Sequence, residues 1–392
     1  METTKGETRR GKDETKDEAL PDFSGLPREI ITDVFLRLPA KSVGRFRCVS
    51  KPYCSMLSDP GFAKRHLALA LKKDSGCQKL VVPSRNLHSV DLDSIGDGCE
   101  GTMVLSGVKD HPKDGLESVS VDWVEMIGSS NGLVCVYSQK GSSNGFVCVY
   151  SPKGGAFLHN PTTGESKRIP ESMLDIVHAC RHFGFGFDTL TEDYKVLKFV
   201  ASDEGYRSVD VYSLKTDSWK RISGLPYKRL GCNPGVHFNG AINWVVKLHK
   251  GHNPKRVVVA AFDLKTEKFR DIPCPDEVED CKYLKAATLK GRLCLVYDSF
   301  DKHDDIWVMN EYGLESSWTK IRLSMSYRSM TPLWSAKNSE EVLLQLDGKF
   351  VLYNFECKTC RNLEFSNVTF RKMFVASTYE ESLISPNSYG NA

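Results

Sequence analysis

Residues 26–51 read LPREIITDVFLRLPAKSVGRFRCVSK, and this stretch decides the N-terminal part of the fold. Pro27 and Glu29 suit the first turn of a helix, because that turn needs no proline N–H and its positive end favours an acidic side chain. Apolar side chains then recur at every fourth position, at Leu26, Ile30, Val34 and Leu38. This spacing predicts an amphipathic helix that ends at Pro39.

Further short helices are predicted up to residue 71. The run Lys41–Val49 places Val43, Phe46 and Val49 on one side of a second helix, and Pro52 interrupts the chain just before Tyr53. Asp59-Pro60 combines a capping side chain with a first-turn proline and opens a last helix. About 45 residues in three or four short helices cannot bury this much apolar surface internally. The surplus predicts a binding partner.

From residue 79 onward the pattern changes to short β-branched and aromatic runs separated by polar turns. One unit recurs: a strand-like run, a polar turn residue, and an aliphatic residue nine positions later. The four copies are Asn160 with Ile169, Ser213 with Ile222, Asp263 with Ile272 and Asn354 with Leu363. A longer version runs from Asn310 to Ile321. A period of about 45–50 residues predicts the blades of a kelch-like β-propeller.

A second recurring element is a tight hairpin at Asn131-Gly132, Asn239-Gly240 and Lys290-Gly291. Asn-Gly is a strong signal for a two-residue hairpin turn. Segments 79–106 and 370–384 are predicted to pair and close a ring of about six blades. An irregular β-sandwich is the alternative architecture.

The N-terminal helices resemble the F-box. The resemblance rests on Leu26–Ile31, Leu36–Val43 and Arg45–Lys51 and covers essentially the whole motif. It implies that the module binds a Skp-type adaptor, which joins it to a cullin and a RING protein. The adaptor-contacting residues it implies are Leu26, Pro27, Ile30, Val34, Leu38, Pro39, Val43, Phe46, Val49 and Tyr53. Tyr53 departs from the family pattern, which usually has the larger tryptophan here.

The strand-rich part resembles the F-box-associated domain of plant F-box proteins. The matching stretches are Gly128–Val134, Asn160–Thr163, Gly184–Asp188, Asp193–Val196 and Ser317–Lys320. The chain is most similar to the constitutive-expresser-of-pathogenesis-related-genes type, which curbs immune receptors, and self-incompatibility F-box proteins share its architecture. The expected division is a disordered tail at 1–21, an F-box module at 22–71, a substrate-binding propeller at 79–384 and a tail at 385–392.

Composition sets limits on the function. The 392 residues carry 53 basic and 50 acidic side chains, a balance that does not favour nucleic acid or an anionic membrane as a partner. The sequence shows neither a signal peptide nor a membrane-spanning stretch, and its 13 cysteines are scattered as in a reducing compartment. We therefore expect a cytoplasmic or nuclear protein.

Candidate catalytic and metal motifs lack their required context. Gly128-x-Ser130-x-Gly132 and Gly141-x-Ser143-x-Gly145 match a hydrolase nucleophile turn, but a strand-like run follows where a helix is needed. Cys357-x-x-Cys360 lacks a second pair at metal spacing. Three histidines lie in strand-like runs, where packing or hydrogen bonding is the expected role: His159, His182 and His237. We expect no catalytic residue, metal or cofactor.

The sequence therefore predicts a non-enzymatic substrate receptor of a Skp–cullin–F-box ubiquitin ligase. An adaptor-binding scaffold without a cullin and a propeller enzyme are the alternatives. The target protein is not encoded in any motif.

A short direct duplication is peculiar to this chain. Residues 128–140 read GSSNGLVCVYSQK and residues 141–153 read GSSNGFVCVYSPK. One blade needs only one such strand, so the pattern predicts that the other copy becomes an extra edge strand or a surface loop.

Overall fold

A computed structural model describes residues 25–72, 78–83, 87–92, 103–104, 106–107, 123–139, 155–172, 183–202, 205–231, 234–249, 256–335, 340–363, 365–366 and 375–389. The predicted tail at 1–21, the second copy of the duplication, its Gly141–Gly145 motif and His182 lie outside these residues. No helix in the described part is both long and apolar enough to cross a membrane.

Four helices begin the described chain, and their boundaries follow the capping signals. They are α1 (Arg28–Arg37), α2 (Ala40–Phe46), α3 (Lys51–Leu57) and α4 (Pro60–Lys72). The Ser50 hydroxyl accepts a hydrogen bond from the Tyr53 N–H at 3.3 Å, which caps α3. The Asp59 carboxylate accepts one from the Phe62 N–H at 2.8 Å, which confirms the cap predicted for the last helix.

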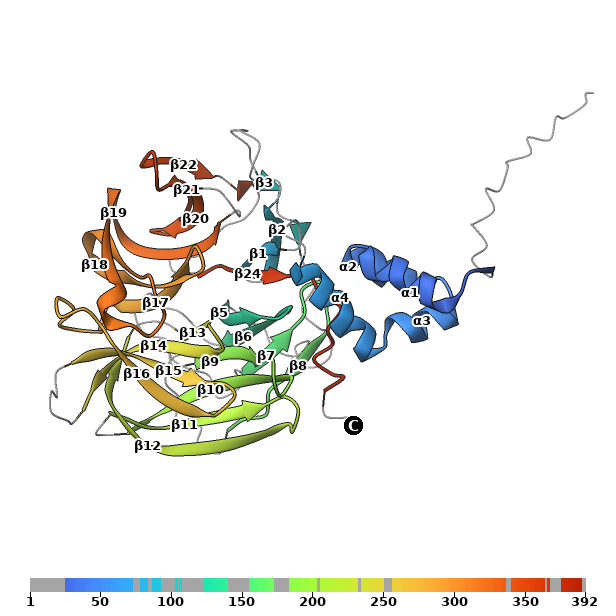
Figure 1. Ribbon diagram of the computed structural model, residues 1–392, viewed down its shortest axis with the longest axis horizontal. Helices are drawn as coiled ribbons and strands as arrows, with labels where there is room; N and C mark the ends of the chain where they lie inside the picture. Colours follow the sequence, from blue (N-terminus) through green and yellow to red (C-terminus); the bar gives the residue numbers. More distant parts are fainter. Residues whose placement is uncertain are drawn as a thin grey trace, which may run out of the picture.

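The rest of the described chain forms six four-stranded antiparallel blades that follow one another around a centre (Figure 1). The first blade combines both ends of the domain: β24 (Ser377–Glu380), β1 (Gln78–Pro83), β2 (Leu87–Asp91) and β4 (Ser106–Gly107). The second contains β5 (Trp123–Ser130), β6 (Leu133–Gln139), β7 (Gly155–His159) and β8 (Ser166–Arg168). The third contains β9 (Phe183–Asp188), β10 (Asp193–Ser202), β11 (Gly205–Ser213) and β12 (Ser218–Leu230).

The fourth blade contains β13 (Val236–Phe238), β14 (Ala241–Leu248), β15 (Val257–Asp263) and β16 (Lys268–Pro273). The last two blades are built from six strands, because the long strands β18 and β19 bend and each count as two blade strands. The six are β17 (Leu284–Leu289), β18 (Arg292–Met309), β19 (Trp318–Ser335), β20 (Glu341–Leu346), β21 (Lys349–Asn354) and β22 (Thr359–Leu363). A small pair, β3 (Met103–Val104) with β23 (Phe365–Ser366), lies outside the blades. This arrangement confirms the propeller and excludes the β-sandwich.

The predicted hairpin turns adopt the backbone that the sequence requires. Asn131 and Gly132 both have positive φ angles, 49° and 82°, as a two-residue type I′ turn demands. Asn239-Gly240 and Lys290-Gly291 repeat the pattern. At Gly132 a side chain is also excluded by space, because an added Cβ would lie 2.3 Å from the Ser382 hydroxyl.

The ring closes as predicted, by pairing the two ends of the domain. β1 runs antiparallel to β24, with Leu80 opposite Thr378 and Val81 opposite Ser377. The Lys79 ammonium adds a bond to Asp91 at 2.9 Å and lies 3.3 Å from Glu381. Burial opposes the charge on Lys79, but the hydrogen bond to Asp91 and the charge of Glu381 outweigh it and raise its pKa.

Candidate adaptor-binding face and central cavity

The exposed apolar surface of the helical module comes mainly from α1, from the residues before it and from the turn after α2. Leu26 is 45 % exposed, Ile30 49 %, Val34 50 % and Val49 58 %. Pro27 and Pro39 are exposed beside them. Six of the ten predicted adaptor contacts are therefore accessible to a partner. Full burial of an aliphatic side chain is worth about 1.5–3 kcal/mol, so covering this surface would contribute several kcal/mol.

The other four predicted residues lie deeper. Val43 is fully buried, and Leu38, Phe46 and Tyr53 are partly buried against the same core. The Phe35 ring holds the group together, with its centroid 5.1 Å from Phe46 and 5.4 Å from Tyr53. Val43 therefore supports the exposed face from beneath. The Tyr53 ring packs edge-on against Phe35, although it is smaller than the tryptophan usual in the family.

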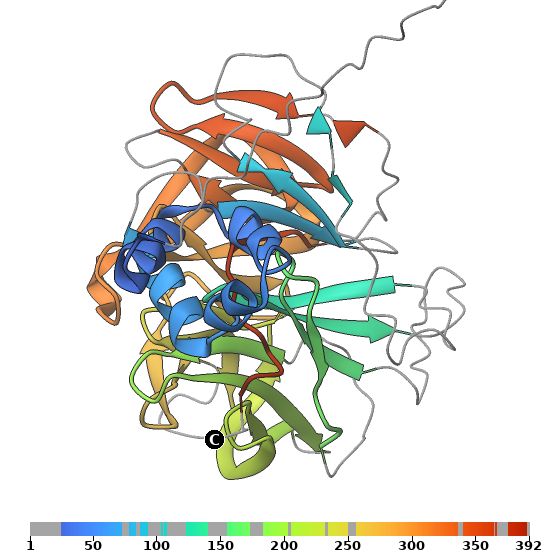
Figure 2. The ribbon, with the colours of Figure 1, turned by 90° about the vertical axis from the view of Figure 1, so that its right-hand side faces the viewer.

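The inner face of the module packs on the propeller. Phe62 and Leu67 of α4 are 1 % and 2 % exposed, and they belong to one apolar cluster with Leu133, Leu383 and other propeller residues. Figure 2 shows the blue helices over one side of the ring. Part of the apolar surplus that predicted a partner is thus covered by the chain itself, and the large apolar side chains of the module that stay exposed are Leu26, Ile30, Val34, Val49 and Leu71.

The segment after β24, residues 381–389, runs between α4 and the propeller and extends beyond the domain boundary expected at 384 (Figure 2). Leu383 and Ile384 are 2 % and 3 % exposed. The buried Asn160 amide donates to the Ser382 carbonyl at 3.0 Å and the Ile384 carbonyl at 2.7 Å. Sequence reasoning missed this role, although the apolar pair Leu383-Ile384 near the chain end was a visible signal.

Charged and aromatic contacts add to the same junction. The Lys64 ammonium of α4 bonds Glu192 at 2.5 Å and lies 5.9 Å from the centroid of the Tyr389 ring. The hydrogen bond and charge of Lys64 lower the pKa of Glu192. The Lys41 ammonium of α2 lies 3.6 Å from Glu381.

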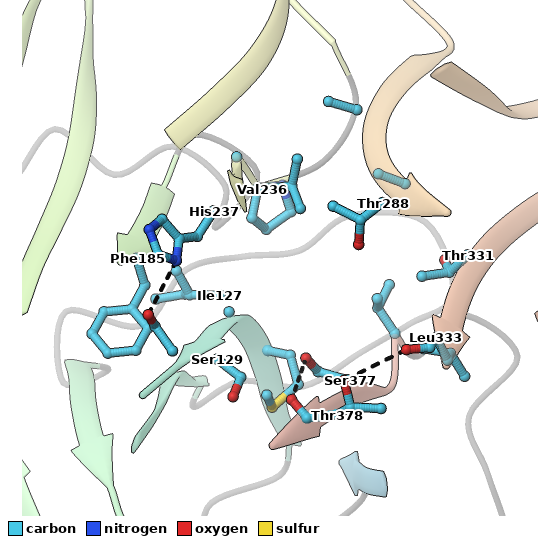
Figure 3. A pocket seen from close by; sticks show the side chains of 18 of the residues that line it. Ile127, Ser129, Phe185, Val236, His237, Thr288, Thr331, Leu333, Ser377 and Thr378 are labelled. Atoms are coloured by element: carbon cyan, nitrogen blue, oxygen red, sulfur yellow. Dashed lines mark hydrogen bonds between the residues drawn. The ribbon is translucent and has the colours of Figure 1, made fainter. Parts of the chain in front are cut away.

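A cavity of about 490 Å³ runs through the centre of the propeller (Figure 3). Its walls come from the innermost strands of all six blades and are rich in hydroxyl groups, among them Ser129, Thr288, Thr331 and Thr378. The buried Lys285 ammonium donates to the Thr331 hydroxyl at 2.8 Å and lies 3.9 Å from Asp298.

The Ser130 hydroxyl in this cavity lies 3.1 Å from Nδ1 of His237, a pairing the sequence did not predict. Ser130 also accepts a hydrogen bond from the Phe187 N–H at 3.1 Å, and the strand β6 follows its turn. Burial lowers the pKa of His237 to about 4, so the imidazole is neutral at pH 7. Nε2 of His237 is buried and has no hydrogen-bond partner among the described residues. A nucleophile–base pair needs a third group that orients the base, and no described residue hydrogen-bonds Nε2 of His237.

The other candidate residues lie in hairpins between neighbouring strands. Nδ1 of His159 lies 2.6 Å from the Ser166 hydroxyl across the β7–β8 hairpin. Cys357 and Cys360 are exposed free thiols at the β21–β22 hairpin. In the described part of the chain, no three His, Cys, Asp or Glu side chains are grouped as a metal site requires.

The described chain joins helices with an exposed apolar face to a six-bladed propeller, as expected of an F-box protein with an F-box-associated domain. Comparison with known families shows the same two parts. Residues 23–65 match the F-box domain, and residues 102–385 match the F-box associated beta propeller domain. The chain belongs to the family of plant F-box proteins with an F-box associated beta propeller domain.

Individual relatives span nearly the whole chain. It is 31 % identical to F-box protein CPR1 of Arabidopsis thaliana over 380 residues, which cover 87 % of this chain and 85 % of the relative. It is 27 % identical to F-box/kelch-repeat protein At3g23880 of the same plant over 382 residues, 92 % of this chain and 96 % of the relative.

Proposed function

We propose that this protein is the substrate-receptor subunit of a Skp–cullin–F-box ubiquitin ligase in the cytoplasm or nucleus. The observation that carries the proposal is the exposed apolar face of Leu26, Ile30, Val34 and Val49 on a module whose opposite face is already covered by the propeller. A Skp-type adaptor would bind the free face and link the chain to a cullin and a RING protein.

The receptor would act without chemistry of its own. Ubiquitin would pass from the conjugating enzyme recruited by the ligase to a lysine of the bound target, and the receptor would contribute proximity. Packing of α4 against the propeller supports this role, because a fixed junction holds adaptor and target in one geometry. Resemblance to the constitutive-expresser type supports a target in plant defence regulation.

The test is co-purification of a Skp-type adaptor and a cullin with the full chain. Ile30→Asp together with Val34→Asp should reduce adaptor binding at least 100-fold with no loss of thermal stability, because both side chains are about half exposed. Leu190→Asp is the matched control, since Leu190 is 64 % exposed on the β9–β10 turn.

Undiminished adaptor binding by the double variant would reject the assigned face. Adaptor binding without any cullin in the complex would instead support the scaffold function.

The division of roles has its own test. A fragment of residues 78–389 should capture the target without the helices and raise its level in cells, because it occupies the target without delivering it. A folded fragment that binds no target protein would contradict this division.

A further inference from the structure

The polar turn residue that recurs in each blade shows which end of the propeller faces the F-box helices. Asn160 follows β7 and lies against Ser382 and Ile384 at the junction with these helices. Asn310 follows β18 and occupies the same position in its own blade. The Asn310 end of β18 therefore faces the F-box side. His303, seven residues earlier, lies roughly 20 Å away at about 3.3 Å per residue, at the opposite end.

A bulge interrupts the pairing of β18 with β19 at that opposite end. The register shifts between Asp298 and His303, so the intervening residues leave the ladder. The rings of Tyr297 and His303 stack with centroids 3.8 Å apart and planes 4° from parallel. The Ser299 hydroxyl lies 2.8 Å from Nε2 of His303 and accepts a hydrogen bond from the Asp301 N–H at 3.2 Å. These contacts give the bulge one defined shape.

Phe300 lies on this bulge and is 86 % exposed, more than any other large apolar side chain in the described part of the chain. β-Bulges commonly re-aim a side chain, and aromatic side chains dominate binding hot spots. The ring stack and the hydrogen bonds fix the backbone around Phe300, so the position of this exposed side chain, the anchor, is preorganised for binding.

The surroundings of Phe300 indicate the charge of its partner. Residues 298–305 read DSFDKHDD, with four aspartates and one lysine. Asp298 and Asp305 lie 3.9 Å and 3.0 Å from Lys285 and Lys320. Asp301 and Asp304 follow Phe300 and are exposed, with the exposed Lys302 between them.

We propose that the target protein docks on the propeller end opposite the F-box and receives Phe300 in an apolar pocket with a basic rim. The proposal rests on the receptor function proposed above and identifies the surface that this function uses. A target bound there does not compete with the adaptor, because the adaptor-binding helices lie on the other side of the propeller.

The experiment places the photo-crosslinking residue benzoylphenylalanine at position 300 of the full chain, co-expressed with the adaptor in plant cells. Leu190, exposed on the F-box side, receives the same residue as the matched control. The protein that crosslinks from 300 and not from 190 is then purified and tested as substrate of the reconstituted ligase. Phe300→Ser should lower its capture and its ubiquitination at least tenfold, and Leu190→Ser should change neither.

A charge test accompanies the anchor test. Asp301→Asn together with Asp304→Asn should weaken capture of the same protein two- to fivefold at low salt and have less effect at high salt, because salt screens exposed charges. If the double variant captures the target with unchanged affinity at low salt, the target's pocket has no basic rim.

The outcomes separate the two proposals. Absence of any crosslink from position 300, or equal capture and ubiquitination by Phe300→Ser, overturns the docking surface. If the wild-type chain binds no adaptor, or captures a target that is never ubiquitinated, the receptor function is rejected. A docking surface at Phe300 then still stands.

Discussion

Helices α1 and α4 have similar amphipathic sequences but opposite surroundings. Ile30 and Val34 of α1 are about half exposed, whereas Phe62 and Leu67 of α4 are buried. The difference arises because Phe62 and Leu67 pack in the apolar cluster shared with the propeller and residues 381–389, whereas Ile30 and Val34 lie on the exposed side of α1. An apolar stripe therefore predicts that a helix will be covered, and only the surrounding structure shows whether the cover is the same chain or a partner.

Breaking the α4 side should have the largest effect. Phe62→Ala removes a ring that is 1 % exposed, so we expect a loss of about 3–5 kcal/mol in the stability of the module. Chemical denaturation followed by hydrogen exchange of residues 28–72 measures it. A loss below about 1 kcal/mol would show that α4 is not docked as described.

The second-largest effect on stability is expected at Asn160, whose side chain holds the C-terminal segment behind α4. Asn160→Ala leaves the carbonyls of Ser382 and Ile384 without their buried donor, so we expect a cost of about 2–4 kcal/mol. Proteolysis should then release the C-terminal segment first. A wild-type cleavage pattern would mean that residues 381–389 are held by their apolar contacts alone.

The α1 side should respond in binding and not in stability. Ile30→Ala is expected to weaken adaptor binding about tenfold, or about 1.4 kcal/mol, while the melting temperature stays the same. Titration with purified adaptor and a thermal melt of the free chain measure the two effects. A melting temperature lowered as much as by Phe62→Ala would erase the contrast between the helices.

A smaller effect is expected at the edge of the junction. Lys64 lowers the pKa of Glu192, so their contact contributes stability above the unfolded pKa of about 4.5 and loses it as the pH falls through the lower folded value. Protection of α4 against hydrogen exchange, corrected for the intrinsic exchange rate at each pH, should therefore fall slightly more between pH 7 and pH 4 in the wild type than in Glu192→Gln. Identical pH profiles would exclude a role for this exposed pair.

The smallest effect is expected from deleting the second copy of the duplication, Gly141–Lys153. The first copy forms the end of β5 and all of β6, and Ser138 pairs with Gly155 at the start of β7. Deleting Gly141–Lys153 leaves a three-residue connection, Gln139-Lys140-Gly154, which suits a β-hairpin. We expect intact adaptor binding and an unchanged or slightly raised melting temperature. Aggregation of the variant would show that both copies are integral strands.

Much of the fold was predictable because its signals are local. Asp59 caps α4, Asn131 and Gly132 adopt the positive φ of a tight turn, and β1 pairs with β24 as the ring required. The candidate site was predictable only in part. Val43 lies on the predicted apolar side of α2, but it is fully buried and therefore belongs to the core of the module. The Ser130–His237 contact joins residues 107 positions apart, so no local sequence pattern predicts it.

The sequence by itself determined the element types, the turns, the repeat and the family, because periodicity, capping and turn chemistry act between residues that are near in the chain. The tertiary structure alone decided which apolar face stays open and that residues 381–389 lie beneath α4. It also decided that Phe300 stands at the end of the propeller away from the helices. These features depend on contacts between residues far apart in the chain, and burial is a property of the assembled fold that no short window of sequence contains.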